Sequence, residues 1–333
     1  MTQDQIKDFV ERLPKCELHL HFEGAVPMGL VRRWCIDPIP DRPKWREHDY
    51  RYRSFADFGQ VIDLTWRETC NSLERLEGVS TRIYEQLFGQ NVRYLEMSFG
   101  VGAYPYPPDE TLAAFKSGVP DGMTVKIIGA LSRDRDVGAV RLARATEYID
   151  ADALDGVDIH GNETVGDPKV FLDLYERARF RGLILKAHAG ELCGPESVEQ
   201  MLDTMKVNRI QHGVRGVESE RLMKRFVDEG ICLDLCPWSN VKLGVYPDLE
   251  THPVADLHRA GVRVTVNTDD PTPFGQTLTD EYGWLMSRRE MTSKEVGQIA
   301  KNGFVVADLP DMVMNQAILE IDDVVTAFSE ETT

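Results

Sequence analysis

Four histidines and a pair of aspartates lie where short apolar runs of the chain end. His19 and His21 close the first such run, residues 16–22. Successive side chains of a strand point to opposite faces, so a spacing of two places both imidazoles on one face. Two imidazoles on one face supply half of the ligands of a metal site. On this run alone, two polar residues on a solvated strand face remain an equal alternative.

Further polar groups follow later apolar runs. His188 lies in the fifth run and Glu191 follows it, His212 lies in the sixth, and Asp269 and Asp270 follow the eighth. If the runs are parallel strands, these groups meet at one end of the sheet. Each also has a structural alternative: a buried histidine for the imidazoles, a first-turn helix carboxylate for Glu191 and a turn residue for Asp270.

The elements that must position these groups alternate regularly along the chain. Apolar, β-branched runs indicate eight strands, at 16–22, 92–99, 124–132, 156–161, 183–189, 209–214, 231–236 and 263–268. Helical patterns lie between most of them, at 109–117, 137–148, 168–181, 195–205, 219–229 and 253–260. This alternation predicts an α/β protein, a parallel (β/α)8 TIM barrel with its chemistry at the carboxyl ends of the strands. An open doubly wound sheet would need a glycine-rich turn after the first strand, which is not found there.

Two stretches interrupt the rhythm. About 70 residues separate the first two strands, and an insertion at this position of a barrel lies on the catalytic face. It contains a charged, proline-rich piece at 37–53 and helical patterns at 54–71 and 73–90. The tail from residue 276 onward is also helical. We therefore expect residues 1–333 to form a single domain in which 37–90 is an inserted cap.

Composition excludes several classes of function. The 333 residues carry a formal net charge of −17, and such a surface repels nucleic acids and anionic membranes. A small neutral or cationic substrate fits this charge better. No apolar run approaches the roughly 18 residues of a membrane span, and the charged N-terminal segment predicts a helix rather than a signal peptide. The six cysteines form no C-x-x-C pair. A soluble cytoplasmic protein is the expectation.

Taken together, the motifs resemble the adenosine deaminase family of the amidohydrolase superfamily. The matching stretches are LPKCELHLHFEGA, GVDIHGNE, KAHAGE, RIQHG, CPWSN and TVNTDDPTPF, in family order between about residues 13 and 275. This combination is highly specific for the family and much less specific for the substrate within it.

The resemblance implies a catalytic centre. One zinc ion would be held by His19, His21, His188 and Asp269. Glu191 would protonate ring nitrogen N1 of a 6-aminopurine, and His212 would orient the attacking water. Asp269 would also accept a hydrogen bond from that water. Asp270 would face N7, and the N–H of Gly161 would face N3. The implied activity is zinc-dependent hydrolytic deamination of an adenosine-like nucleoside, with a small-molecule purine as the only implied partner and the oligomeric state undetermined.

Position 23 departs from the family pattern. The adenosine enzymes typically have an aspartate there that meets the ribose 5′-hydroxyl, whereas this chain has Glu23, one methylene longer. Relatives acting on free adenine or on aminodeoxyfutalosine, a modified adenine nucleoside, more often have glutamate. These substrates are therefore the alternatives, with a different amidohydrolase reaction as a more remote one.

Four other residues remain ambiguous. His160 stands where the family usually has a small residue, so it either enters the pocket or packs beneath it. Lys186 shares a face with His188, but a metal-bridging lysine would belong to the fourth strand, so Lys186 is interpreted as structural or as a residue that supports the metal ligands without binding the metal. Cys193 and Trp238 either line the site or pack nearby.

Overall fold

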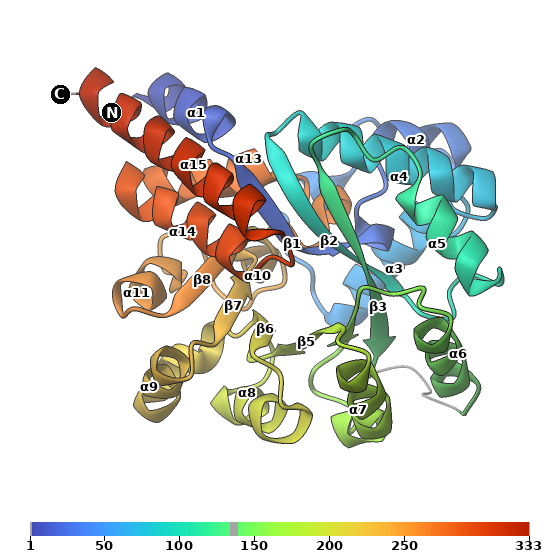
Figure 1. Ribbon diagram of the computed structural model, residues 1–333. Helices are drawn as coiled ribbons and strands as arrows, with labels where there is room; N and C mark the ends of the chain where they lie inside the picture. Colours follow the sequence, from blue (N-terminus) through green and yellow to red (C-terminus); the bar gives the residue numbers. More distant parts are fainter. Residues whose placement is uncertain (1, 134–138, 333) are drawn as a thin grey trace.

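The architecture is a parallel barrel surrounded by helices (Figure 1). The computed structural model describes residues 2–133 and 139–332, in which eight parallel strands are wound in chain order. The strands are β1 (Lys15–His21), β2 (Val92–Gly100), β3 (Thr124–Ser132), β4 (Gly156–His160), β5 (Ile184–Ala189), β6 (Arg209–His212), β7 (Cys232–Leu235) and β8 (Arg263–Val266). Each predicted strand is present and ends within two residues of its predicted bounds. The (β/α)8 prediction is confirmed.

Helices alternate with the strands as predicted. Those before β3 are α1 (Gln3–Arg12), α2 (Met28–Trp34), α3 (Phe55–Trp66), α4 (Leu73–Phe88) and α5 (Pro108–Lys116). Those between β3 and β7 are α6 (Ala139–Asp150), α7 (Leu172–Phe180), α8 (Pro195–Gln200) and α9 (Glu220–Asp228). The remainder are α10 (Pro237–Lys242), α11 (Val254–Arg259), α12 (Pro271–Phe274), α13 (Leu278–Ser287), α14 (Ser293–Val306) and α15 (Asp311–Glu331). Residues 137 and 138 of the predicted helix 137–148 lie outside the described ranges.

Alternate side chains of β1 face two different layers, the surrounding helices on one side and the interior of the barrel on the other. All seven residues of β1 are buried. Cys16 and Leu18 face α14, where a Cβ on Gly303 would lie 2.9 Å from that of Cys16. The opposite face therefore carries Glu17, His19 and His21 into the barrel. The two histidines thus lie on the same face of β1, as their spacing in the sequence predicts.

The barrel closes between β1 and Asp269, three residues after the end of β8. The N–H of His21 donates to the carbonyl of Asp269 at 3.0 Å, and the N–H of Asp269 donates to the carbonyl of His19 at 2.8 Å. These bonds form a parallel bridge between Leu20 and Asp269. The hydrogen bonds of this bridge therefore come from His19, His21 and Asp269, three of the residues predicted to bind metal.

Side chains replace the main-chain ladder deeper in this seam. The side-chain oxygen of Asn267 accepts the N–H of Leu18 at 2.7 Å. The Glu17 carboxylate accepts the hydroxyl of Thr268 at 2.8 Å and its N–H at 3.2 Å. Asn267 and Glu17 are fully buried, so water cannot replace either acceptor.

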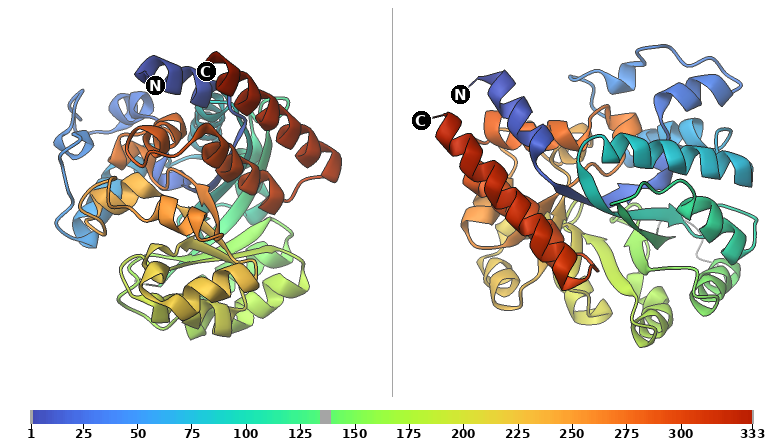
Figure 2. Two further views of the ribbon diagram at one scale, coloured as in Figure 1. Left: turned by 90° about the vertical axis from the view of Figure 1, so that its left-hand side faces the viewer. Right: turned by 45° about the horizontal axis from the view of Figure 1, so that its top comes forward.

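The insertion and the tail lie on different sides of the barrel. Helix α3 contacts the turn Phe22–Gly24 and α12 beside the carboxyl ends of the strands, while α4 packs against β2 and α5. Helices α1 and α15 lie side by side, with the rings of Phe9 and Phe328 4.6 Å apart (Figure 2). Among the described residues, no helix has the length and apolar character needed to cross a bilayer.

We predict that Asn267→Ala lowers the free energy of unfolding by about 1–3 kcal/mol, because the buried N–H of Leu18 loses its acceptor. Urea unfolding followed by circular dichroism measures the change. The control is Asn302→Ala, which removes a 2.9 Å hydrogen bond from α14 to the Val264 carbonyl of β8. A loss no larger in Asn267→Ala than in this control would contradict a special role for the seam.

Candidate metal centre and active site

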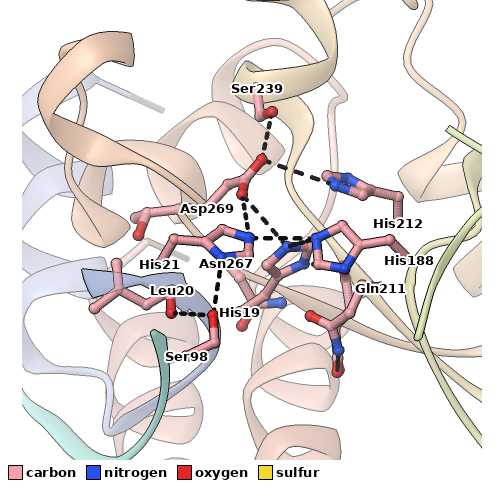
Figure 3. A network of polar contacts seen from close by, with 12 residues as sticks. His19, Leu20, His21, Ser98, His188, Gln211, His212, Ser239, Asn267 and Asp269 are labelled. Atoms are coloured by element: carbon pink, nitrogen blue, oxygen red, sulfur yellow. Dashed lines mark hydrogen bonds and ion pairs between the residues drawn. The ribbon is translucent and has the colours of Figure 1, made fainter. Parts of the chain in front are cut away.

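Three imidazoles and one carboxylate converge at the carboxyl end of the barrel (Figure 3). The Nε2 atom of His188 lies 3.0 Å from Nε2 of His19 and 3.2 Å from Nε2 of His21. Oδ1 of Asp269 lies 3.4 and 3.2 Å from the same atoms of His19 and His21. One potential ligand atom from each residue falls within 4.8 Å of all the others. The structure thus brings together the four residues predicted to bind metal.

The outward-facing nitrogens show how these rings are oriented. Nδ1 of His19 lies 3.2 Å from the carbonyl of Asp234, and Nδ1 of His188 lies 3.1 Å from the carbonyl of Ile159. A carbonyl only accepts, so both Nδ1 atoms carry the hydrogen and both Nε2 atoms present lone pairs to each other. Two facing lone pairs at 3.0 Å repel unless a cation lies between them. The donor set therefore fits a divalent metal ion.

Further contacts hold the side chains of the candidate metal ligands in place. Ser98 Oγ lies 2.8 Å from Nδ1 of His21, and the Asp158 carboxylate lies 3.1 Å from Nδ1 of His188. The Ser239 hydroxyl donates to Oδ2 of Asp269 at 2.7 Å. Outer partners of this kind hold a ligand's orientation and tune its basicity.

Two residues of the site adopt left-handed backbone conformations. His212 has φ +64° and Asp269 has φ +63°. This region is uncommon for residues other than glycine, and its cost is tolerated where the surroundings over-determine the conformation. At Asp269 the two bonds to β1 provide that constraint.

Glu191 and His212 lie beside the ligand cluster. Oε1 of Glu191 is 3.5 Å from Nε2 of His212, which is 3.8 Å from Oδ2 of Asp269. The side-chain amide of Asn240 donates to Oε1 of Glu191 at 3.0 Å and lies 3.3 Å from Nδ1 of His212. Burial, together with the charges of Asp269 and Glu163, raises the pKa of Glu191 well above its usual range. A protonated Glu191 can act as an acid near neutral pH.

A cavity of about 370 Å³ opens over the cluster. Its wall comes from the carboxyl ends of β1 to β6, the residues after β8, and helices α3 and α6. Glu23, Gly161 and Asp270, predicted to bind substrate, all line it, as does His160. The rings of His160 and His21 are stacked with centroids 5.4 Å apart, so His160 enters the pocket.

Glu23 is held by groups of the protein itself. Its Oε1 accepts the N–H of Gly100 at 3.0 Å and the hydroxyl of Tyr104 at 3.2 Å. The next residue, Gly24, leaves room for Asp270, because a Cβ there would lie 1.7 Å from Oδ1 of Asp270. The turn after β1 thus sets the positions of two carboxyl groups in the cavity.

Three of the ambiguous residues lie outside the cavity. Lys186 projects into the barrel below the site, where its ammonium donates to the Leu18 carbonyl and to Glu96. The thiol of Cys193 contacts the carbonyl of Glu163. Trp238 packs in a separate apolar cluster, with its indole N–H donating to the Phe274 carbonyl.

Several positioning groups escaped the sequence reasoning. They are Ser98, Asp158, Glu163, Ser239 and Asn240. The last four lie within the quoted motifs GVDIHGNE and CPWSN, so the motifs located them without revealing what they contact. The periodicity of β4 could have identified Asp158, because it shares a strand face with His160.

The fold and this donor set define a metal-dependent hydrolase of the amidohydrolase type. The family model for adenosine deaminase matches residues 14–324. The chain belongs to the adenosine deaminase family. The predicted reaction class, deamination of a 6-aminopurine, is confirmed at that level.

Individual relatives cover nearly the whole chain. An adenine deaminase of Agrobacterium fabrum is 31% identical to this chain, and the match covers 93% of this chain and 98% of the relative. An adenine deaminase of Zymomonas mobilis is 32% identical, and the match covers 96% of this chain and 98% of the relative. The crystal structure of an adenine deaminase from Arthrobacter aurescens superposes with a TM-score of 0.85 at 24% identity, covering 94% of this chain and 99% of that one. An amidohydrolase from Burkholderia ambifaria, crystallised with bound zinc, gives a TM-score of 0.82 at 24% identity, covering 97% and 94%.

We predict that Asp158→Asn weakens metal binding by about 10- to 100-fold, because the amide orients His188 less firmly than the carboxylate does. Competition with a chromophoric chelator measures the affinity. Asp155→Asn is the matched control, since this carboxylate pairs with Lys116 at 3.1 Å outside the site. Equal affinities of both variants would refute the assignment.

Proposed function

We propose that the enzyme hydrolyses free adenine to hypoxanthine and ammonia. The observation that carries this proposal is the position of Glu23. In the adenosine-type pattern a shorter carboxylate is available to a ribose hydroxyl. Here the carboxylate reaches further, and one of its oxygens is occupied by Gly100 and Tyr104. A substrate without ribose does not need this group. The relatives named adenine deaminase support the same substrate.

One zinc ion per chain is the proposed cofactor, held by His19, His21, His188 and Asp269. Three imidazoles and one carboxylate leave a position open for water, and bound zinc lowers the pKa of that water toward about 7. The zinc named in the Burkholderia ambifaria structure supports this choice of metal.

The residues of the chain orient the purine and move protons. We assign Glu191 as the acid that delivers a proton to N1 of the ring, which prevents the ring from carrying the full negative charge during attack. His212, 3.5 Å from Glu191, orients the attacking water. Asp270 faces N7 and the N–H of Gly161 faces N3, so the ring is held in its plane. Asp269 accepts a hydrogen bond from the water.

An adenosine-like nucleoside is the second candidate substrate. The cavity of about 370 Å³ extends from the metal ligands to α3 and α6, beyond the residues assigned to the purine ring. We propose that residues 37–90 serve as a cap within a single domain. In support, Phe55, Phe58 and Trp66 of α3 line the cavity.

The substrate is tested with an ammonia-release panel of adenine, adenosine, 2′-deoxyadenosine and aminodeoxyfutalosine. We expect adenine to give the highest kcat/KM. Glu23→Asp should raise the adenosine-to-adenine ratio of kcat/KM by about 10- to 100-fold, because removing one methylene frees space and a carboxylate for ribose.

Glu110→Asp, the same change on the surface of α5, is the control and should leave this ratio unchanged. A wild-type enzyme that prefers a nucleoside would reject the adenine proposal while leaving the reaction class intact. An unchanged ratio in Glu23→Asp would reject the role of Glu23.

Glu191→Gln should retain one zinc per chain and lose about 10²- to 10⁴-fold in kcat, because glutamine cannot deliver the proton to N1. Metal analysis of the same samples used for kinetics separates chemistry from metal loss. A rate near that of the wild type would disprove the acid assignment, and folded wild-type protein without a divalent ion would disprove the cofactor.

A further inference from the structure

A single buried carboxylate binds the loop that carries Glu191. Glu163 follows β4, and only 7% of its surface is exposed. Its Oε2 accepts the N–H groups of Glu191 at 3.0 Å, Leu192 at 2.7 Å and Cys193 at 2.9 Å. Its Oε1 accepts the N–H of Gly190 at 2.5 Å and the hydroxyl of Ser197.

Four consecutive N–H groups directed at one carboxylate restrain the whole turn. Hydrogen bonds to an ionised acceptor are shorter and stronger than neutral ones, and successive N–H groups of this kind form an anion-binding concavity. Gly190 has φ +68°, and a Cβ at this position would lie 2.4 Å from Val198. The conformation of the turn therefore depends on this glycine and on the carboxylate beneath it.

The side chain of Glu191 is held from the opposite direction. Val254 donates its N–H to Nδ1 of His252, so Nε2 of this neutral ring carries the hydrogen and donates to Oδ1 of Asn240 at 3.1 Å. The other end of the amide, Nδ2, then faces Glu191 at 3.0 Å. Burial lowers the pKa of His252 to about 3, which keeps the ring in this neutral form.

We propose that Glu163 is a positioning residue for the catalytic acid. It does not line the cavity, and it acts by fixing the main chain of residues 190–193 so that the Glu191 carboxyl meets Asn240 and the substrate ring. This inference rests on the proposed role of Glu191. It adds a residue that holds the acid in place without touching the purine.

The test compares Glu163→Gln with the wild type. Glutamine keeps the size of the side chain, but its NH2 end cannot accept from the main-chain N–H groups. A misplacement of about 1 Å at a reacting group can cost on the order of 10²-fold. We expect kcat per bound zinc to fall about 10- to 100-fold, while KM for adenine and the zinc content stay close to the wild-type values. Glu163→Asp, which keeps the charge, should recover part of the loss.

Glu196→Gln is the matched control. This exposed carboxylate accepts the N–H of Gly194 at 3.2 Å in the same loop, without contacting the main chain of Glu191. It should leave kcat unchanged. A purely structural role of Glu163 would reduce the folded, zinc-loaded fraction and leave kcat per zinc unchanged, which would overturn the proposal.

A double variant sharpens the distinction. If Glu163 acts through Glu191, adding Glu163→Gln to Glu191→Gln should produce almost no further loss of kcat, whereas independent roles would multiply the two losses.

If Glu163→Gln does not fold, Ser197→Ala removes one donor to the same carboxylate and should lower kcat by about 2- to 10-fold. Unchanged kcat in that variant would also overturn the proposal. A wild-type enzyme inactive on every purine would instead reject the proposed function.

Discussion

The main-chain bridge that closes the barrel is the constraint on which the site depends. It joins His19 and His21 to Asp269, and the side chains of these three residues belong to the candidate metal centre. A change in the register of β1 against β8 would separate the imidazoles from the carboxylate at once. The left-handed conformation of Asp269 is held by the same two bonds. The same hydrogen bonds therefore close the barrel and bring the candidate metal ligands together.

A layer of paired charges supports this bridge from below. Arg209 contacts Asp234 at 2.7 Å and Glu96 at 3.2 Å, and Lys186 contacts Glu96 at 3.0 Å. The Asp234 carbonyl in turn accepts from His19. Removing one member would leave a buried charge without a partner, which costs far more than the pair contributes to stability. The layer therefore fixes the arrangement beneath the ligands.

The sequence predicted those site residues whose type alone indicates a chemical role, such as histidines and acidic residues at the ends of strands. Imidazoles at 19 and 21 and carboxyl groups at 269 and 270 fall at strand ends, and the strand period determines which face they occupy. Glu163 could not be recognised in this way, because its partners are main-chain N–H groups nearly thirty positions further along the chain. Likewise, the difference between glutamate and aspartate at position 23 was visible in the sequence. The contacts of Glu23 with Gly100 and Tyr104 were not, because they depend on how the turn after β1 meets the end of β2.

Glu163 contributes to both the position and the protonation of Glu191, the proposed acid, together with burial and the charge of Asp269. The Glu163 carboxylate holds the main chain of Glu191, and its negative charge also contributes to the raised pKa of that residue. An apolar side chain in this place could fix the turn but would not favour the protonated form of Glu191. A cationic group would lower the pKa of Glu191. A buried anion satisfies both needs, and the main-chain N–H groups offset the cost of burying it. This explains why a carboxylate, normally expensive in such a place, occupies the base of the loop.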